Sequence, residues 1–202
     1  MLRNGRMAGG MGPQQDPNDP PRWTTYFAAD DADAVAQQIA AADGTVLVPP
    51  MDVGPMGRMA IAADPQGSPF GIWQGGLNTG VRVYAEPGAL VWNDAATADP
   101  AAAREFYTAV FGFRWDEVPG AGGYCTFATD DRPLGGLGGT SPGLPTGWQI
   151  CFAVAGTDEA VGAVEAGGGT VLMAAQDTEF GRIAVVADPW GAAFAVMAVV
   201  SG

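Results

Sequence analysis

The feature that most constrains the fold is an internal repeat, in which residues 23–73 align with residues 148–197. At an offset of 125 the matching residues are Trp23 and Trp148, Phe27 and Phe152, Asp33 and Asp158, and Gly44-Thr45-Val46 and Gly169-Thr170-Val171. After a slip of one residue the matches continue with Gly57-Arg58 and Gly181-Arg182, Asp64-Pro65 and Asp188-Pro189, Gly67 and Gly191, and Phe70 and Phe194. Matches in this order predict one structural unit that is used twice.

The first copy of the repeat starts in its middle. Residues 6–12 (RMAGGMG) follow residues 132–138 (RPLGGLG), but nothing before Arg6 corresponds to residues 89–131. Residues 75–88 mix Gly, Asn and Pro with a single strand-like run at 81–84, which is typical of a linker. We therefore predict an incomplete first domain at residues 1–74, a linker at 75–88 and a complete second domain at 89–202.

Residues 148–199 predict a strand, a helix and three strands. An apolar strand at 148–154 precedes a helix that Thr157 caps, that buries Val161 and Val164, and that ends at the glycines 167–169. Strands follow at 170–173, 182–187 and 192–199, and the Asp-Pro-Trp-Gly sequence at 188–191 makes the last turn.

Residues 89–139 have the same plan. A strand at 90–97 leads to an N-cap at Asp99, with Pro100 at the first helical position and Gly112 at the helix end. The apolar stripe of this helix is formed by Phe106, Tyr107, Val110 and Phe111. Strands are expected at 113–118, 124–128 and 132–138. The sequence thus predicts an α+β domain made of two βαβββ modules.

The composition removes several classes of function. Nine arginines face 22 acidic residues, and the net charge of −13 disfavours nucleic acid and anionic membranes as partners. Without histidine there is neither an imidazole metal site nor a Ser-His-Asp triad, and without lysine there is neither a Schiff base nor a P-loop. Cys125 and Cys151 lie in apolar segments, which favours free thiols in a cytoplasmic protein, although a disulfide stays open.

Three features together resemble the vicinal-oxygen-chelate superfamily, the glyoxalase/bleomycin-resistance/dioxygenase type. They are the paired βαβββ modules, the helix sequence AREFYTAVFG at 103–112, and the Asp-Pro-x-Gly turn before the last strand. The nearest likeness is to tandem-domain members of actinobacterial type. The resemblance implies a cupped, mixed or antiparallel sheet with the helices outside, and a metal ion or small ligand held in the cup.

The metal-ligand positions that the resemblance implies hold unsuitable residues. On the first strands of modules they are Trp92, Thr24 and Gln149, and on the last strands Gly71 and Ala195. None is a histidine or a glutamate, so we predict no metal and no other cofactor. A register shifted by one would bring Asn93 or Asp94 into play, but no second ligand with them.

The candidate ligand-binding residues are Trp92, Asp94, Gln149, Cys151, Thr24 and Tyr26. Asp94 either faces the cup as an acid, base or ligand anchor, or lies at the surface, and Trp92 either stacks on a planar ligand or packs in the core. Gln149 is a hydrogen-bonding ligand contact if its face is the cup. Cys151 is better explained as a buried, inert thiol than as a nucleophile, and no catalytic residue is predicted.

Three recurring features have structural explanations. The glycine run at 135–139 has no lysine after it and recurs at 9–12, so it suits a bend or the close approach of another backbone. The Asp-Pro-x-Gly turns are structural, and Arg58 and Arg182 suit turn bonding better than anion binding.

These observations favour a cytoplasmic protein that binds a small organic molecule in a cup without metal ligands. One alternative is a metal-dependent lyase, isomerase, dioxygenase or hydroxylase of the same superfamily. Another is an incomplete product, in which either the true start lies upstream or a second chain pairs with the first domain, as in a homodimer.

Overall fold

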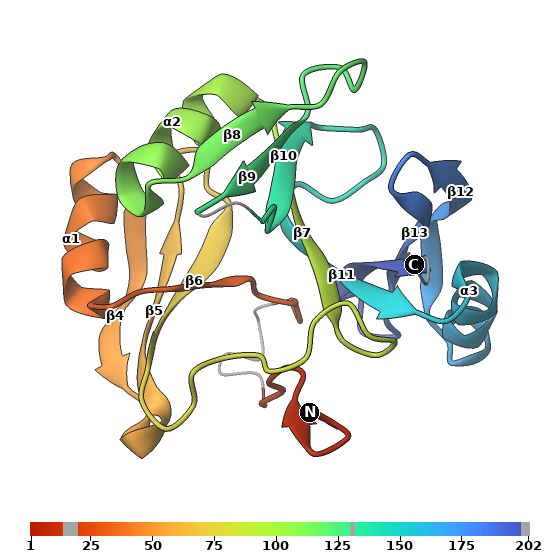
Figure 1. Cartoon of the computed structure of the whole chain (residues 1–202), viewed down its shortest axis with the longest axis horizontal. Helices are drawn as coiled ribbons and strands as arrows, with labels where there is room; N and C mark the ends of the chain where they lie inside the picture. Colours follow the sequence, from red (N-terminus) through yellow and green to blue (C-terminus); the bar gives the residue numbers. More distant parts are fainter. Residues whose placement is uncertain (14–19, 130–131, 199–202) are drawn as a thin grey trace.

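The computed structural model describes residues 1–13, 20–129 and 132–198. Its largest sheet has eight strands, built by two successive βαβββ segments (Figure 1). The first segment comprises β7 (Leu90–Thr97), α2 (Pro100–Phe111), β8 (Arg114–Glu117), β9 (Cys125–Ala128) and β10 (Gly135–Gly139). The second comprises β11 (Gly147–Val154), α3 (Thr157–Ala166), β12 (Thr170–Thr178), β13 (Gly181–Ala187) and β14 (Ala193–Ala198).

The two segments meet through their first strands. The strand order is β12-β13-β14-β11-β7-β10-β9-β8, with β7 and β11 antiparallel at the centre. Each of these strands also pairs in parallel with the last strand of its own segment, β10 or β14. The sheet is therefore mixed, and the predicted α+β class with paired βαβββ modules is confirmed.

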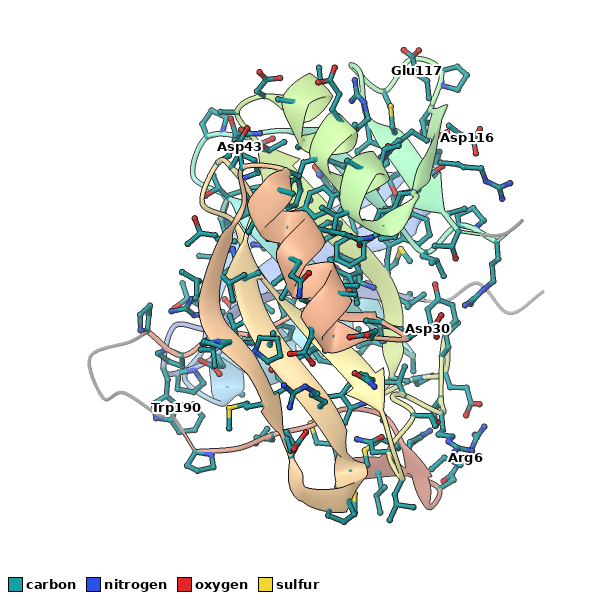
Figure 2. The ribbon with its side chains drawn as sticks, turned by 90° about the vertical axis from the view of Figure 1, so that its left-hand side faces the viewer. Arg6, Asp30, Asp43, Asp116, Glu117 and Trp190 are labelled. Atoms are coloured by element: carbon teal, nitrogen blue, oxygen red, sulfur yellow. The ribbon has the colours of Figure 1, made fainter. Side chains whose placement is uncertain are left out.

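A third βαβββ segment forms a separate four-stranded sheet. It comprises β3 (Tyr26–Ala28), α1 (Ala32–Ala41), β4 (Thr45–Asp52), β5 (Gly57–Ala63) and β6 (Pro69–Gly75). The strand order is β3-β6-β5-β4, so the first strand lies at an edge. Figure 2 shows α1 lying across one face of this sheet. A short 3-10 turn, Gly54–Met56, joins β4 to β5.

Local signals explain where the helices start and end. The Asp99 side chain accepts a hydrogen bond from the backbone N–H of Ala102, and Gly112 ends α2 in the left-handed region at φ 69°, both as predicted. The prediction for Thr157 is wrong, because Gly156 is the N-cap of α3. The Thr157 hydroxyl is buried and instead donates to the carbonyl of Arg182, 2.6 Å away, across to β13.

A shared aromatic core joins the two sheets. The ring centroid of Phe27 in β3 lies 4.9–6.4 Å from those of six aromatic side chains, namely Phe70, Tyr107, Phe111, Phe113, Phe127 and Trp148. The Trp148 indole donates to Tyr107, whose hydroxyl donates to the buried carboxylate of Asp64. The helix-covered face of the smaller sheet thus packs on α2 and on the back of the larger sheet.

The N-terminal segment and the linker have little regular structure. Residues 6–12 correspond to the strand predicted at 132–138, but a strand forms there at Arg6–Met7 alone (β2), which pairs with β1 (Leu2–Arg3). The strand predicted at 81–84 is reduced to one bridge between Tyr84 and Leu90. Val83 is nevertheless buried, so residues 75–88 pack against the rest of the chain. Within the described part of the chain, no helix has the length and apolar character needed to span a bilayer.

Candidate functional site

The centre of the eight-stranded sheet brings four of the six predicted ligand-binding residues together. Asp94 of β7 lies opposite Gln149 of β11, and Trp92 lies opposite Cys151. Directly opposed residues share a face of the sheet, and so do residues two apart on one strand. These four side chains therefore lie on one face, which we call the cup.

A hydrogen-bonded chain links two of these residues through a tyrosine. The Trp92 indole N–H donates to the Tyr124 hydroxyl, 3.0 Å away, and that hydroxyl donates to Asp94 Oδ1 at 2.7 Å. Tyr124, which lies just before β9, is not among the residues predicted from the sequence. The available signal is the glycine run of β10, because a Cβ on Gly136 would come within 1.9 Å of the tyrosine oxygen. The glycine at that position makes room for an aromatic side chain.

Burial sets the acid–base properties of the site. Asp94 is half-buried, and desolvation raises the pKa of its carboxyl to about 6 despite the hydrogen bond from Tyr124 and the nearby Trp92 indole. Burial and the nearby Asp94 carboxylate raise the pKa of Tyr124 above its usual value, so the phenol remains a donor. Burial likewise raises the pKa of Cys151 to about 12, which leaves a protonated thiol at neutral pH.

Gln149 carries a polar group that lacks a partner. Its side-chain Nε2 is shielded from solvent and donates no hydrogen bond to any described residue. A buried amide donor without an acceptor costs about 1–3 kcal/mol, so such groups are uncommon and call for an explanation. Because Gln149 lies directly opposite Asp94 in the strand register, this unused donor belongs to the same face of the sheet as the Asp94 carboxylate.

Apolar side chains surround this polar pair. Cys151, Val185 and Ala195 form the buried floor of the cup. Half-buried side chains pack around that floor, among them Trp92, Leu144, Met173, Ile183 and Met197. Phe180, from the turn between β12 and β13, places its ring 6.4 Å from that of Tyr124. The site is therefore a small polar centre on an apolar, partly aromatic surface.

The other two predicted residues lie elsewhere. Tyr26 belongs to β3 of the four-stranded sheet, where its ring lies over Gly71 and its side chain is 44% exposed. Thr24 precedes that strand and is half-buried. They do not join Trp92, Asp94, Gln149 and Cys151 in one site.

The recurring arginines are bound within the protein. Arg58 pairs with Asp33 and Asp52 at 2.8 Å, as Arg182 pairs with Asp158 and Asp177 at 2.8 and 3.1 Å. These ion pairs connect each helix start to the adjacent hairpin, so the arginines act structurally.

Comparisons with known proteins agree with this architecture. The family model of the Glyoxalase/Bleomycin resistance protein/Dioxygenase superfamily matches residues 89–196. The chain belongs to this superfamily. It is 37% identical over 182 residues to "Putative glyoxylase CFP32" of Mycobacterium tuberculosis, an alignment that covers 88% of this chain and 70% of that protein. It is 38% identical over 197 residues to "Anthracycline biosynthesis protein DnrV" of Streptomyces peucetius, covering 95% and 71%.

Solved structures of the superfamily share the fold. The 2,2',3-trihydroxybiphenyl 1,2-dioxygenase of Sphingomonas wittichii strain RW1 has a TM-score of 0.60 at 19% identity, covering 91% of this chain and 73% of the enzyme. The Mn(II)-bound glyoxalase of Novosphingobium aromaticivorans has a TM-score of 0.59 at 16% identity, covering 86% and 61%. At these identities the likeness concerns the fold alone.

The superfamily cup commonly holds a metal ion, but the side chains here do not fit one. Asp94 is the sole carboxylate among the cup residues. Gly136, its partner on β10, and Ala195, the partner of Cys151 on β14, offer no side-chain ligand. Trp92 can only donate hydrogen bonds. Across the described residues, no three His, Cys, Asp or Glu side chains cluster as a metal site would require.

Proposed function

We propose that the chain binds a small organic molecule in the cup of the eight-stranded sheet without a metal ion. The observation that carries the proposal is that two polar residues lie opposite each other on an apolar surface. They are Gln149, whose amide lacks a hydrogen-bond partner, and Asp94, whose carboxylate can accept hydrogen bonds. Ligand sites are commonly mostly apolar, with a few polar groups that fix orientation. A ligand would supply the acceptor that Gln149 lacks.

The two polar groups define the chemistry of the ligand. With a pKa of about 6, Asp94 is mainly ionised at pH 7 and can only accept hydrogen bonds. The ligand should therefore present a donor to Asp94 and an adjacent acceptor to Gln149. A flat apolar frame would contact Trp92 and the side chains of Ile183 and Met197. A hydroxyl next to a carbonyl on an aromatic ring meets these demands.

A second candidate function is an enzyme that uses Asp94 as a general base. A carboxyl with a pKa near 6 suits proton transfer close to neutral pH, and Tyr124 would stabilise its ionised form. Curated relatives and structural neighbours are named as a glyoxylase and as dioxygenases. Turnover of a glyoxalase or dioxygenase substrate that is lost in Asp94→Asn would favour this candidate.

Two further proposals concern organisation and location. We propose residues 1–74 and 89–202 as two domains around the linker at 75–88, packed together through the shared aromatic core. A cytoplasmic setting would keep Cys125 and Cys151 as the free, buried thiols seen here.

Calorimetric titration tests the binding proposal. Because one relative is named for anthracycline biosynthesis, 1,4-dihydroxyanthraquinone is a suitable first probe, and anthraquinone, which lacks hydroxyl donors, is its matched control. We expect Gln149→Met and Asp94→Asn to weaken binding of the dihydroxy compound about tenfold each, the value of one lost hydrogen bond. Gln37→Met, an exposed glutamine on α1, should have no effect.

Two results would refute the proposal. One is stoichiometric, tight binding of Mn²⁺ or Zn²⁺ that Asp94→Asn abolishes. The other is that 1,4-dihydroxyanthraquinone and anthraquinone bind with equal affinity, both to the wild type and to Gln149→Met.

A further inference from the structure

The four-stranded sheet presents an apolar face to solvent. On the side away from α1, apolar residues of neighbouring strands lie opposite one another. The pairs are Val48 with Ile61, Met51 with Met59, Met59 with Trp73, and Ile61 with Gly71, and Gly71 in turn pairs with Tyr26. Tyr26, Val48 and Met51 are 44, 36 and 49% exposed. We call this surface, with the outer edge of β3, the open face. Apolar surface of this kind marks an interaction site.

The same face is covered in the other copy of the repeat. Tyr26 corresponds to Cys151, and Ile61 to Val185, and in the larger sheet these equivalents are only 2 and 6% exposed. They are covered because β7 pairs with β11, and the segment that starts at β7 contributes Trp92 and Tyr124 to the cup. The open face therefore corresponds to the half of the cup that β11 and β14 contribute, and no second module covers it among the described residues.

The edge of β3 is available for a strand equivalent to β7. Gly71 N–H donates to the Thr25 carbonyl and Ala29 N–H to the Trp73 carbonyl, so residues 25, 27 and 29 bond to β6. In a strand, the intervening backbone groups of Tyr26 and Ala28 point to the other side. No described strand lies on that side. The edge is thus a template for an added strand.

A second copy of the chain does not fit on this edge. Thr25 corresponds to Ile150, which lies opposite Asn93 at the centre of the β7–β11 pair. Thr25 also contacts that same Asn93, with 3.1 Å between Oγ1 and Oδ1. If β3 paired with its own copy in the geometry of β7 and β11, the two Thr25 Cα atoms would lie about 5 Å apart. Each Thr25 would then hold its own Asn93, and the two eight-stranded sheets would overlap.

We propose that the open face binds one additional βαβββ module, of the kind that starts at β7, and that this module completes a second cup containing Thr24 and Tyr26. A single module adds the strand for the β3 edge and the cover for the apolar face, without a second large sheet. The length of the relatives is compatible, because 182 aligned residues are 70% of the Mycobacterium protein and leave about 80 outside the match. One module takes only the span Leu90–Gly139 here.

The internal repeat provides the fusion protein that tests the proposal. Residues 6–12 correspond to 132–138, so a copy of residues 89–131 placed directly before Arg6 supplies a whole module, with 6–12 as its last strand. Hydrogen exchange would be measured at the Tyr26 and Ala28 amides. We expect exchange at least 100-fold slower in the fusion than in the 202-residue chain, and a monomer in both cases by native mass spectrometry. The matched control carries Trp92→Pro in the inserted copy. In the larger sheet Trp92 lies opposite Cys151, the equivalent of Tyr26, so this proline should block strand pairing at Tyr26, and the control should exchange like the unfused chain.

Three outcomes would overturn the proposal. The first is a dimer of the 202-residue chain in which the Tyr26 and Ala28 amides are already protected. The second is a fusion whose inserted segment folds but leaves those amides unprotected. The third is a fusion whose inserted segment stays unfolded, as its own amides would show by rapid exchange.

Discussion

The two copies of the repeat share the same interactions within a module, but they differ in whether a second module packs beside it. In both, an arginine at the start of the third strand binds two aspartates, and an aspartate at the last turn accepts backbone N–H groups. In the part of the chain that the structure describes, a sister module completes the cup of the second copy but not that of the first. Local sequence therefore specifies the module, whereas the partner decides whether its inner face becomes a ligand site.

Removal of equivalent phenylalanines should show the largest difference between the copies. Phe27 is buried among six aromatic rings, whereas Phe152 is half-buried between Trp23 and Phe194. We expect Phe27→Ala to lower the free energy of unfolding by about 3–5 kcal/mol, and Phe152→Ala by about 1–2 kcal/mol. Denaturant titration measures both, and equal losses would show that Phe27 does not hold the two sheets together.

Asp94 should make the stability of the completed cup depend on pH. Its pKa is about 6 in the folded protein against an ordinary value of 3.8 for an exposed aspartate, so the folded state binds more protons between pH 4 and 6. Its contribution to stability therefore falls as pH rises through this window, by up to about 3 kcal/mol. The difference in unfolding free energy between Asp94→Asn and the wild type should grow in the variant's favour from pH 4 to pH 7. A constant difference would refute the burial of this carboxyl.

Removal of the hydroxyl of Tyr124, in the completed cup, should lower stability more than removal of the hydroxyl of Tyr26, on the open face. Tyr124→Phe leaves the Trp92 indole without its acceptor and Asp94 without its donor, which should cost about 1–2 kcal/mol. The side chain of Tyr26 is 44% exposed, and Tyr26→Phe should change stability by less than about 0.5 kcal/mol. Thermal unfolding of the two variants gives the comparison. A larger loss for Tyr26→Phe would mean that the open face is already covered.

The smallest expected loss of stability follows removal of the recurring arginines, and it should be equal in the two copies. Arg58→Ala and Arg182→Ala each remove a partly exposed arginine with two aspartate partners. Exposed ion pairs contribute little to stability, and added salt should reduce both losses. Urea titration at low and high salt tests this. Clearly unequal losses would contradict the equivalence of the modules.

Much of the fold is predictable because the signals are local or repeated. The N-cap at Asp99, the left-handed Gly112 and the matched turns at Asp64 and Asp188 specify the modules, and the strand boundaries follow. The prediction for Thr157 is wrong because its hydroxyl bonds to β13, a contact between segments distant in sequence. A short-range pattern contains no information about that contact.

The candidate site is predictable in part, because alternation of side chains along a strand is a local signal. Alternation along β7 and β11 places Trp92, Asp94, Gln149 and Cys151 on one face, which the sequence pattern suggests. Tyr124 enters the site from a loop that has no counterpart in the first copy. Its role depends on the glycine at position 136, and that pairing becomes visible only in three dimensions.

The most direct test of the account is whether ligand enters the completed cup and avoids the open face. The chain has six tryptophans, so the indole N–H signals can be assigned and followed by NMR during titration with 1,4-dihydroxyanthraquinone. The account predicts that the signals of the Trp92 indole and the Gln149 amide shift, and that the indole of Trp73, on the open face, stays unchanged. Shifts at Trp73 without shifts at Trp92 and Gln149 would contradict it.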